Sequence, residues 1–497
     1  PSKHSCQHIP RKGNMSEGSD RQKVVITNER TKVTTGTEVQ EKLIVAARVF
    51  SDLLKPTFGP RGLDKMMFKT DGSTSVTNDG AKIVAELLVK HPAAKMMVSM
   101  AESQEEACGD GVTTTMLLCG SLLIEANSLL RKGLHPLTLV DGYAISLEAC
   151  RGQIESDSVE PNKERLLSVS ETALRGKVAE GAISDFPPMI VQAINTVHEN
   201  RGEAGAEHIS MFKTRTGGIR DSRLVSGVIF RRRVMMDGLP NDISNARVAC
   251  LDGDIKIREM ARDAELKISK AEVLDSFIEA EKNRKESIFE SISRSGANVV
   301  LCSGEVDKDI LHLLSENRVL VVGELDSSEL RNASEATGSM IVDTPWDIEE
   351  SDLGFSGRVS WERRQETDEV EDVFRIDECQ SPCIVTIEVG GAGETATEEV
   401  IRGLHDSLRA TSLALNQQVL PGAGSIHSRM AQAVREASEK QGGRERLAME
   451  AFSRALETIP ATLAENGGGD PLDRVLELRA ASIEDDPIGI TSDGKTW

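Results

Sequence analysis

The sequence predicts a multi-domain fold: a mostly α-helical unit built from both ends of the chain, with α/β units inserted between. Three observations support this prediction. The chain has 497 residues, which is too long for a single hydrophobic core. Apolar residues recur at helical spacing over about the first 160 residues, and again from about Thr397 to Ala481. Between these regions, short apolar runs alternate with helical stretches, which is typical of βαβ units.

The N-terminal region is predicted to contain several long helices and one hairpin. A helix begins at Thr37-x-x-Gln40, which has the form of a capping box, and continues at helical spacing to Leu54. Asp71-Gly72 is the type of two-residue turn that joins hairpin strands. The predicted strands are Met66–Thr70 and Ser73–Thr77, and further helices are predicted over Ala81–Val89, Ala93–Ala107 and Thr113–Leu130.

The middle of the chain has the pattern of a separate α/β domain. Ala297–Cys302 and Arg318–Val322 are short apolar runs that predict buried strands, with the helical stretch Asp309–Ser315 between them. A second helix over Glu329–Thr337 leads to the strand-like Met340–Val342. This alternation predicts a parallel sheet.

Composition and charge argue against two classes of partner. A formal net charge of −21 opposes binding to nucleic acid, which needs a basic surface. Arg231-Arg232-Arg233 is too short to supply one, and we interpret it as a solvated strand edge. The longest apolar runs fall well short of the roughly 20 residues that a membrane helix needs, so no contact with a membrane is expected.

The cysteines and the opening residues favour a cytoplasmic location. The eight cysteines are scattered and lie mostly in apolar surroundings, as expected for thiols in a reducing compartment. Cys379 and Cys383 alone are a weak zinc signal. The first residues lack the apolar core of a secretory signal, and Met15 fits a natural start.

Three glycine-containing turns, of which the second and third are acidic, are the strongest functional signal, and each is expected to open a helix. Glycines let backbone N–H groups approach an anion, and a helix N-terminus carries positive charge to hold it. An aspartate beside a phosphate is explained if Mg²⁺ lies between them. Each turn alone fits an ordinary helix cap, but the three together favour a nucleotide site, although no Walker motif occurs. The turns are Thr57–Pro60, Thr77–Gly80 and Gly109–Thr115.

A series of ordered segments carries a family resemblance over nearly the whole chain. The segments are TFGPRGLDKM (57–66), TNDGAKI (77–83), GDGVTTT (109–115), LRGK (174–177), GANVVLCSGEVDKDILHLL (296–314), EEVIRGLHDSLRAT (398–411), VLPGAGS (419–425) and ENGGGDPLDRVLELRAA (465–481). In this order and spacing they resemble the group II chaperonins, the family of the archaeal thermosome and its eukaryotic cytosolic relatives. The resemblance implies an ATP-dependent chaperone subunit that encloses and folds non-native proteins in a double-ring cavity, driven by hydrolysis of Mg·ATP.

The resemblance also implies roles for individual residues. Asp110 would hold Mg²⁺ on the phosphates of ATP, and Lys177 would sense the γ-phosphate. Asp79 and Asp406 would flank the γ-phosphate and position the attacking water, with Asp406 the better candidate for the general base. Without the resemblance, Asp406 in a predicted helix Thr397–Ala410 is better interpreted as a solvated carboxylate. The other nucleotide-binding residues would be Thr57, then Gly59, Pro60, Gly111, Thr113 and Thr114 around the phosphates, and Gly422, Gly424 and Asn466 against ribose and adenine.

The same resemblance implies three domains and a set of partners. An equatorial ATP-binding domain would take residues 1–161 and 403–497, an intermediate domain 162–230 and 383–402, and an apical client-binding domain 231–382 with a helical protrusion near 269–290. The hinges would be Gly217-Gly218 and Gly390–Gly393. The partners would be non-native clients and identical or paralogous subunits in a stacked double ring. Candidate contact residues are Val273, Leu274, Phe277, Ile278, Ile288 and Phe289 in the protrusion, and Ile310, Leu311, Leu313 and Leu314 in the next helix.

Several residues depart from the family pattern. Val112 stands where threonine is usual, so we expect a hydroxyl donor to be lost and Val112→Thr to strengthen ATP binding or speed hydrolysis severalfold; the alternative is that the valine serves packing. Ala423 replaces the middle glycine of a GGG loop, and His427 stands where an acidic residue is common. The chain stops at Trp497, where the family continues, so weakened self-association is expected. An alternative therefore stays open: a chaperonin-like subunit with slow or lost ATPase that acts as a structural or client-binding partner.

Overall fold

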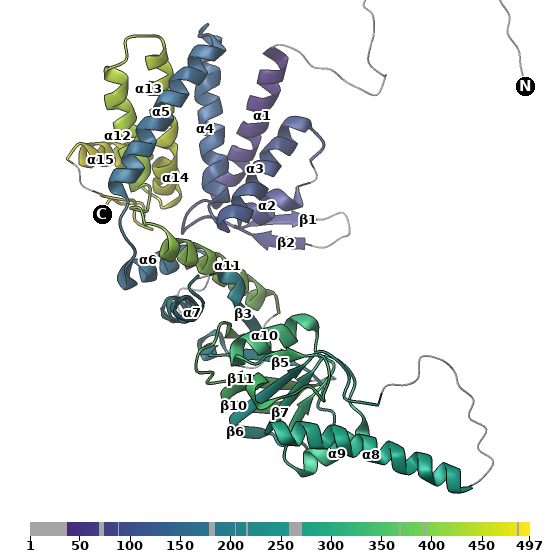
Figure 1. Ribbon diagram of the computed structural model, residues 1–497. Coiled ribbons are helices and arrows are strands. Elements are labelled where there is room, and N and C mark those ends of the chain that lie inside the picture. The colour runs from purple at the N-terminus through teal and green to yellow at the C-terminus, as the bar shows by residue number, and fades with distance from the viewer. Residues whose placement is uncertain are drawn as a thin grey trace, which may run out of the picture.

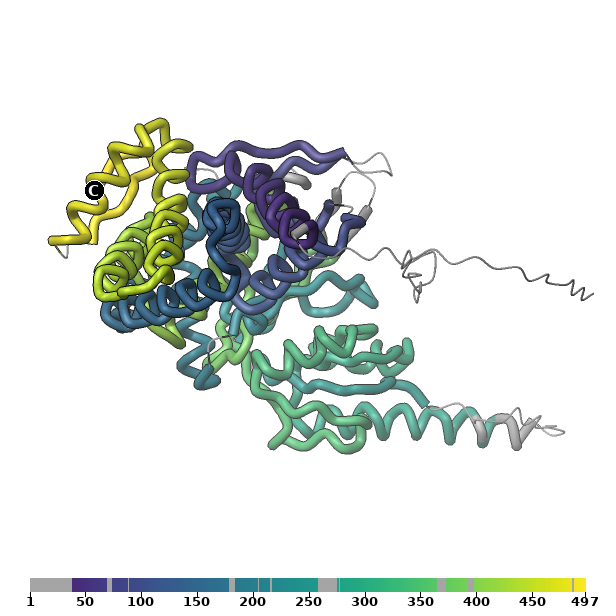
Figure 2. The backbone as a smooth tube through the Cα atoms, turned by 90° about the horizontal axis from the view of Figure 1, so that it is seen from above, coloured from purple at the N-terminus to yellow at the C-terminus, as the bar shows by residue number. Residues whose placement is uncertain are grey.

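The computed structural model describes residues 37–68, 74–87, 89–177, 184–203, 205–214, 217–257, 271–366, 369–391, 394–484 and 487–497. These residues form a helical unit, a small middle unit and an α/β unit, arranged in a row (Figure 1). Seen from above, the helices from the two ends of the chain lie together in the first unit (Figure 2). The mixed helical and strand content agrees with the predicted multi-domain fold.

The helical unit is built around the long helix α4, Val112–Arg131. On one side α4 packs against α1, Thr37–Leu54, and on the other against α13, Glu445–Leu456, so it joins the two ends of the chain. The other elements of this unit are β1 (Lys65–Phe68), β2 (Thr74–Thr77), α2 (Gly80–Glu86), α3 (Pro92–Cys108), α5 (Pro136–Asp157), α12 (Ser425–Glu439), α14 (Thr458–Asn466) and α15 (Pro471–Ile483).

The predicted N-terminal helices and the two hairpin strands are confirmed, with ends shifted by a few residues. The predicted turn, Asp71-Gly72, lies outside the described residues.

Helix α4 corrects one expectation. Within the described part of the chain it is the one helix that is long and apolar enough to cross a membrane by length and composition. However, Met116 and Leu117 on α4 are fully buried among the neighbouring helices, as in the core helix of a globular unit. The apolar length of α4 therefore serves packing between the two chain ends.

The middle unit consists of a three-stranded sheet covered by helices. Strand β12, Val385–Gly390, pairs in parallel with β3, Ile209–Thr214, and antiparallel with β4, Arg223–Val225. The buried helices beside this sheet are α6 (Lys163–Leu174), α7 (Phe186–Arg201) and α11 (Glu394–Asn416).

Helix α11 determines where the candidate site lies. Its residues Leu404 and Leu408 are fully buried in one core with Ile190 of α7 and Ile387 of β12. The boundary expected between residues 402 and 403 falls inside this continuous helix, so by packing the whole of α11 lies with the middle unit.

The α/β unit has a mixed sheet. Its strand order is β5-β11-β10-β6-β7-β8, with β9 also paired to β6. Strands β6, β7 and β8 are parallel, which confirms the predicted βαβ pattern. The long antiparallel pair β10–β11 was not predicted. The elements are β5 (Val228–Arg231), β6 (Asp242–Leu251), α8 (Ala271–Ser295), β7 (Val299–Cys302), α9 (Lys308–Glu316), β8 (Leu320–Val322), α10 (Ser327–Thr337), β9 (Ile341–Val342), β10 (Gly354–Glu366) and β11 (Glu369–Asp377).

The candidate client-contact residues are divided between the core and the surface. Helix α8 extends beyond the sheet (Figure 1), and Ile288 near its base is fully buried whereas Ile278 is 56% exposed. On α9, Ile310 and Leu314 are core residues. The side chains of Val273, Leu274 and Phe277 lie outside the described part of the structure.

Two arginines join the α/β unit to the middle unit: Arg375, which is buried, and Arg231, which is half-buried. Arg375 on β11 donates a 2.8 Å hydrogen bond to Glu388 on β12, and both side chains are about 95% buried. Arg231 on β5 lies 4.8 Å above the ring of Phe212 and donates to the carbonyl oxygen of Lys213. The interpretation of Arg231 as a solvated strand edge is therefore wrong, because this side chain forms part of the joint between two sheets.

The Arg375–Glu388 pair yields a stability prediction. Replacing Glu388 by Gln removes the charge that compensates a buried guanidinium, so the free energy of unfolding should fall by about 3–5 kcal/mol. Urea unfolding followed by circular dichroism measures this loss. The matched control is Glu399→Gln, which removes a half-exposed partner of Arg402 within α11 and should cost less than about 1 kcal/mol. Equal effects of the two substitutions would contradict a structural role for the joint.

Candidate functional site

A cavity of about 1030 Å³ lies where α11 of the middle unit faces the helical unit. Its walls include residues of all three glycine turns, the segment 175–177 that follows α6, and the loop Pro421–Gly424 before α12. This volume is at the upper end of the range for small-molecule sites, and so has room for a nucleotide.

The second turn is fixed by a helix cap. Asp79 caps α2, and its Oδ1 accepts a 3.0 Å hydrogen bond from the N–H of Ala81. A Cβ at Gly80 would lie 2.2 Å from Oγ1 of Thr113, so only glycine lets α2 start this close to the start of α4. The local sequence therefore brings the Asp79 carboxylate and the first turn of α4 to the same wall of the cavity.

The third turn presents the N-terminus of α4 to the cavity. Helix α3 ends at Gly109 and α4 begins after Gly111, both with positive φ, +68° and +85°. Asp110 between them accepts a 2.8 Å hydrogen bond from the N–H of Gly111. No side-chain hydrogen bond caps α4 within the described residues, so its first N–H groups are free to bind an anion.

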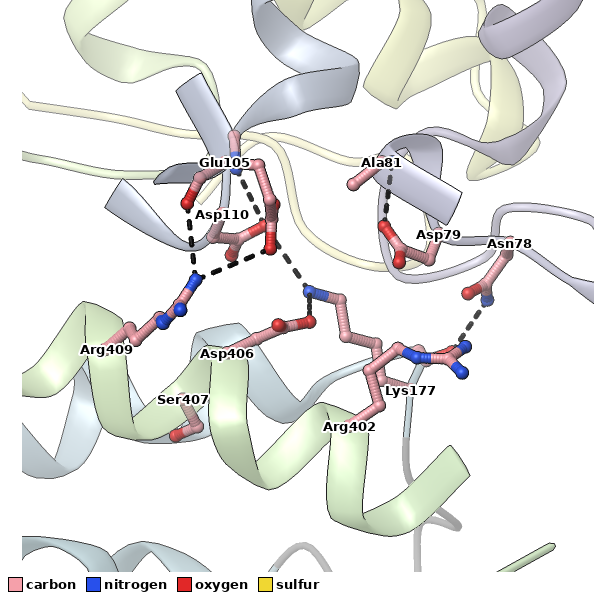
Figure 3. Close-up of polar contacts among 12 residues, drawn as sticks. Asn78, Asp79, Ala81, Glu105, Asp110, Lys177, Arg402, Asp406, Ser407 and Arg409 are labelled. Atoms are coloured by element: carbon pink, nitrogen blue, oxygen red, sulfur yellow. Dashed lines mark hydrogen bonds and ion pairs between the residues drawn. The ribbon is translucent and has the colours of Figure 1, made fainter. Parts of the chain in front are cut away.

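The ammonium group of Lys177 joins two carboxylates from different units (Figure 3). Its Nζ lies 2.7 Å from Oδ2 of Asp406 on α11 and 3.4 Å from Oδ1 of Asp110 in the third turn. Asp406 is 92% buried, which excludes the solvated position that its helix alone suggested. The three groups form the polar centre of the cavity.

Burial and neighbouring charges shift the ionisation of these groups. Burial raises the pKa of Asp406 to about 7, and Asp110 and Asp79 act in the same direction, while Lys177 opposes the shift. Burial opposes the charged form of Lys177, but Asp110, Asp406 and Asp79 outweigh it and hold the pKa of Lys177 above its usual value. Asp406 can therefore gain or lose a proton near neutral pH, while Lys177 stays charged.

The residues fit a nucleotide carrying Mg²⁺. Asp79, Asp110 and Asp406 offer the oxygen ligands that this cation prefers, beside backbone N–H groups suited to phosphate. Among the described residues, no group of three His, Cys, Asp or Glu side chains could hold a metal by itself. A cation here would therefore take further ligands from the phosphates, as Mg²⁺ usually does in such sites.

The structure brings nearly all the predicted site residues to this cavity. The residues that line it are Thr57, Gly59, Pro60, Asp79, Asp110, Gly111, Thr113, Thr114, Lys177, Asp406, Gly422 and Gly424. The hydroxyl of Thr57 is already used, because it donates to the carbonyl of Leu54 at the end of α1.

Asn466 has a different place from the one predicted. It does not line the cavity; its amide donates to the carbonyl oxygens of Lys55 and Phe58, at 2.9 and 2.8 Å. Asn466 thus supports the first turn, Thr57–Pro60, through its amide nitrogen, and its expected contact with adenine stays a prediction.

Several residues of the cavity wall were not predicted from the sequence. Glu105 on α3 faces the site, and burial, followed by the charge of Asp79, raises its pKa. Ile459 and Leu463 of α14 add an apolar wall against which the nucleobase of a nucleotide could pack. Burial lowers the pKa of His427 to about 4, so this departure from the family pattern is a neutral imidazole. The one available signal was that Glu105 lies four residues, about one helical turn, before Gly109 of the third turn.

The structure favours the packing role for Val112. Its side chain is 97% buried and belongs to a core cluster with Leu54, Ile83 and Met116. The backbone N–H of residue 112 begins α4 regardless of the side chain.

Comparison with known proteins agrees with these observations. Residues 50–496 match the model of the TCP-1/cpn60 chaperonin family. A thermosome subunit beta of Desulfurococcus mucosus is 36% identical over 461 residues, which cover 91% of each chain. A thermosome subunit beta of Archaeoglobus fulgidus is 36% identical over 93% of this chain and 85% of its own length. A thermosome subunit of Methanocaldococcus jannaschii is 34% identical over 92% of this chain and 85% of its own.

The position of Val112 leads to a prediction. Val112→Thr places a hydroxyl in an apolar core, so it should lower the free energy of unfolding by about 1–3 kcal/mol. The affinity for a non-hydrolysable ATP analogue should stay within about twofold of the parent value. Thermal unfolding and titration calorimetry on both proteins measure these quantities. A gain in affinity of severalfold would show instead that a missing hydroxyl donor limits binding.

Proposed function

The chain belongs to the TCP-1/cpn60 chaperonin family, as a group II chaperonin, and on this premise we propose that it hydrolyses Mg·ATP to drive protein folding. In this proposal the subunit encloses non-native proteins in a double-ring cavity. The observation that carries it is the Lys177 ammonium between Asp110 and Asp406, at the centre of a nucleotide-sized cavity.

Different residues around the cavity have different roles in hydrolysis. The N–H groups at the start of α4, together with the glycine turns, hold the phosphates. Asp406 accepts a proton from the attacking water, and its pKa of about 7 suits a general base near neutral pH. Asp79 lies on the same wall of the cavity as the start of α4, and it orients the attacking water or the metal. Lys177 contacts the terminal phosphate. Mg²⁺ bound with ATP neutralises phosphate charge, which is its usual contribution in phosphoryl transfer.

The position of Asp406 links hydrolysis to the rest of the molecule. Its helix α11 follows β12, and β12 is tied through Glu388 to Arg375 of the α/β unit. A shift of α11 toward or away from the nucleotide is therefore passed to the unit that carries α8 and α9. This connection supports α8 and α9 as the elements that meet clients and neighbouring subunits.

Assembly with other subunits and a cytoplasmic location are part of the proposal. The relatives compared above are named as thermosome subunits, which supports assembly of this chain with identical or paralogous subunits. The cytoplasmic location rests on the scattered cysteines, which suit a reducing compartment. The alternative of a chaperonin-like partner with slow or lost ATPase gains no support from the geometry, because Asp79, Asp110, Lys177 and Asp406 all line one cavity.

Two substitutions test the proposed roles separately. Asp406→Asn should lower the rate of ATP hydrolysis by about 10²–10⁴, the range for loss of a general base, and leave binding of a non-hydrolysable analogue nearly intact. Asp110→Asn should weaken binding of the Mg²⁺ complex itself. Steady-state phosphate release and titration calorimetry measure the two effects. The control is Asp141→Asn, an exposed carboxylate on α5, which should behave as the parent.

Hydrolysis by Asp406→Asn at the parent rate would refute the assignment of the base. A parent protein that binds ATP without hydrolysing it would support the alternative function.

A further inference from the structure

A second contact joins α11 to the helical unit beside the Lys177 bridge. Arg409 lies one helical turn beyond Asp406, and its Nη1 donates to the carbonyl oxygen of Glu105 at 3.3 Å. The same nitrogen lies 3.7 Å from Oε1 of the Glu105 carboxylate. Figure 3 shows Arg409 reaching from α11 to Glu105 on the opposite side of Asp406 from Lys177.

The stem of Arg409 also packs on the turn that carries Asp110. A Cβ at Gly109 would lie 2.0 Å from Cδ of Arg409, so the arginine stem packs directly on this glycine, whose positive φ of +68° also favours glycine. Arg409 therefore touches both the last turn of α3, through Glu105, and the start of the third acidic turn.

The contact crosses between two separately packed units. Leu404 and Leu408 fix α11 in the core of the middle unit, whereas Met97 and Ala101 fix α3 in a core of the helical unit. Since neither core contains both helices, their relative position depends on contacts across the gap, and Asp406 moves with α11.

We propose that Arg409 is a positioning residue for ATP hydrolysis: its contact with Glu105 sets the register of α11 against α3, and so places the Asp406 carboxylate in the cavity. The inference rests on the proposed function. Arg409 also compensates the charge of Glu105, which would otherwise add a fourth carboxylate to a site that already holds Asp79, Asp110 and Asp406.

The contribution of Arg409 should appear in catalysis and be small in stability. The two side chains are 47% and 37% exposed, and ion pairs at such positions stabilise a fold by at most about 1 kcal/mol. A displacement of a catalytic group by about 1 Å can nevertheless lower a rate by about 10²-fold. ATP binding depends on the glycine turns and the start of α4, which the loss of Arg409 leaves in place.

Arg409→Met and Arg402→Met form a matched pair of variants for the test. Arg402 is on the same helix, but its ion pair is with Glu399 of α11 itself and not with a residue of α3. Arg409→Met should lower kcat about tenfold or more, with the Kd for a non-hydrolysable ATP analogue within about twofold and the melting temperature nearly unchanged. Arg402→Met should keep the parent kcat. Exchanging the charges, Arg409→Glu with Glu105→Arg, should recover most of the lost kcat.

Amide hydrogen exchange adds a readout that does not need hydrolysis. In the absence of nucleotide, Arg409→Met should speed exchange in the part of α11 around Asp406, and Arg402→Met should not. A parent-like kcat or parent-like exchange in Arg409→Met would overturn the proposal, as would a parallel loss of kcat, affinity and melting temperature. If the parent protein fails to hydrolyse ATP, the proposed function fails, and exchange in α11 alone then decides whether Arg409 sets the helix register.

Discussion

The ion pairs of Lys177 with Asp110 and Asp406 are the interaction on which the arrangement of the site depends. Three aspartates face one cavity, and together they would repel each other and any phosphate. The Lys177 ammonium, 2.7 Å from Asp406 and 3.4 Å from Asp110, compensates this charge and at the same time joins α11 to the third acidic turn. The Lys177 side chain thus both neutralises charge in the cavity and forms one of the contacts between the two units.

The rest of the fold brings these groups together from distant parts of the sequence. Helix α4 packs between segments from both chain ends and presents its N-terminus to the cavity, while α11 is fixed in the core of the middle unit. Because the general-base candidate lies on a helix of a different unit from the phosphate turns, the site is complete only when the two units meet. The buried Arg375–Glu388 joint then couples the middle unit to the α/β unit beyond it.

Helix caps and turns could be predicted, because they depend on residues a few positions apart. Strand pairing and side-chain contacts could not, because they depend on residues far apart in the sequence. The second and third turns and the helices that follow them were predictable, because glycine and aspartate determine caps within a few residues. The first turn, Thr57–Pro60, was also expected to open a helix, but strand β1 follows it. Strands β10 and β11 were missed, since much of their length carries charged side chains that find partners on other strands, as Arg375 finds Glu388. The contacts of Arg231, Asn466 and Val112 are with residues far away in the sequence, so their roles could not be predicted from residue type alone. Domain limits and the assignment of catalytic roles came from family resemblance, and they remain predictions.

The affinity of Lys177→Met for the Mg²⁺ complex of a non-hydrolysable ATP analogue tests the central claim most directly. A hydrogen bond to a charged group contributes roughly 1.5–3 kcal/mol, so losing the ammonium should weaken binding about tenfold or more relative to the parent. Titration calorimetry on folded parent and variant protein gives this ratio. An unchanged affinity would contradict the account, because it would mean that the charge at the centre of the cavity does not act on the nucleotide.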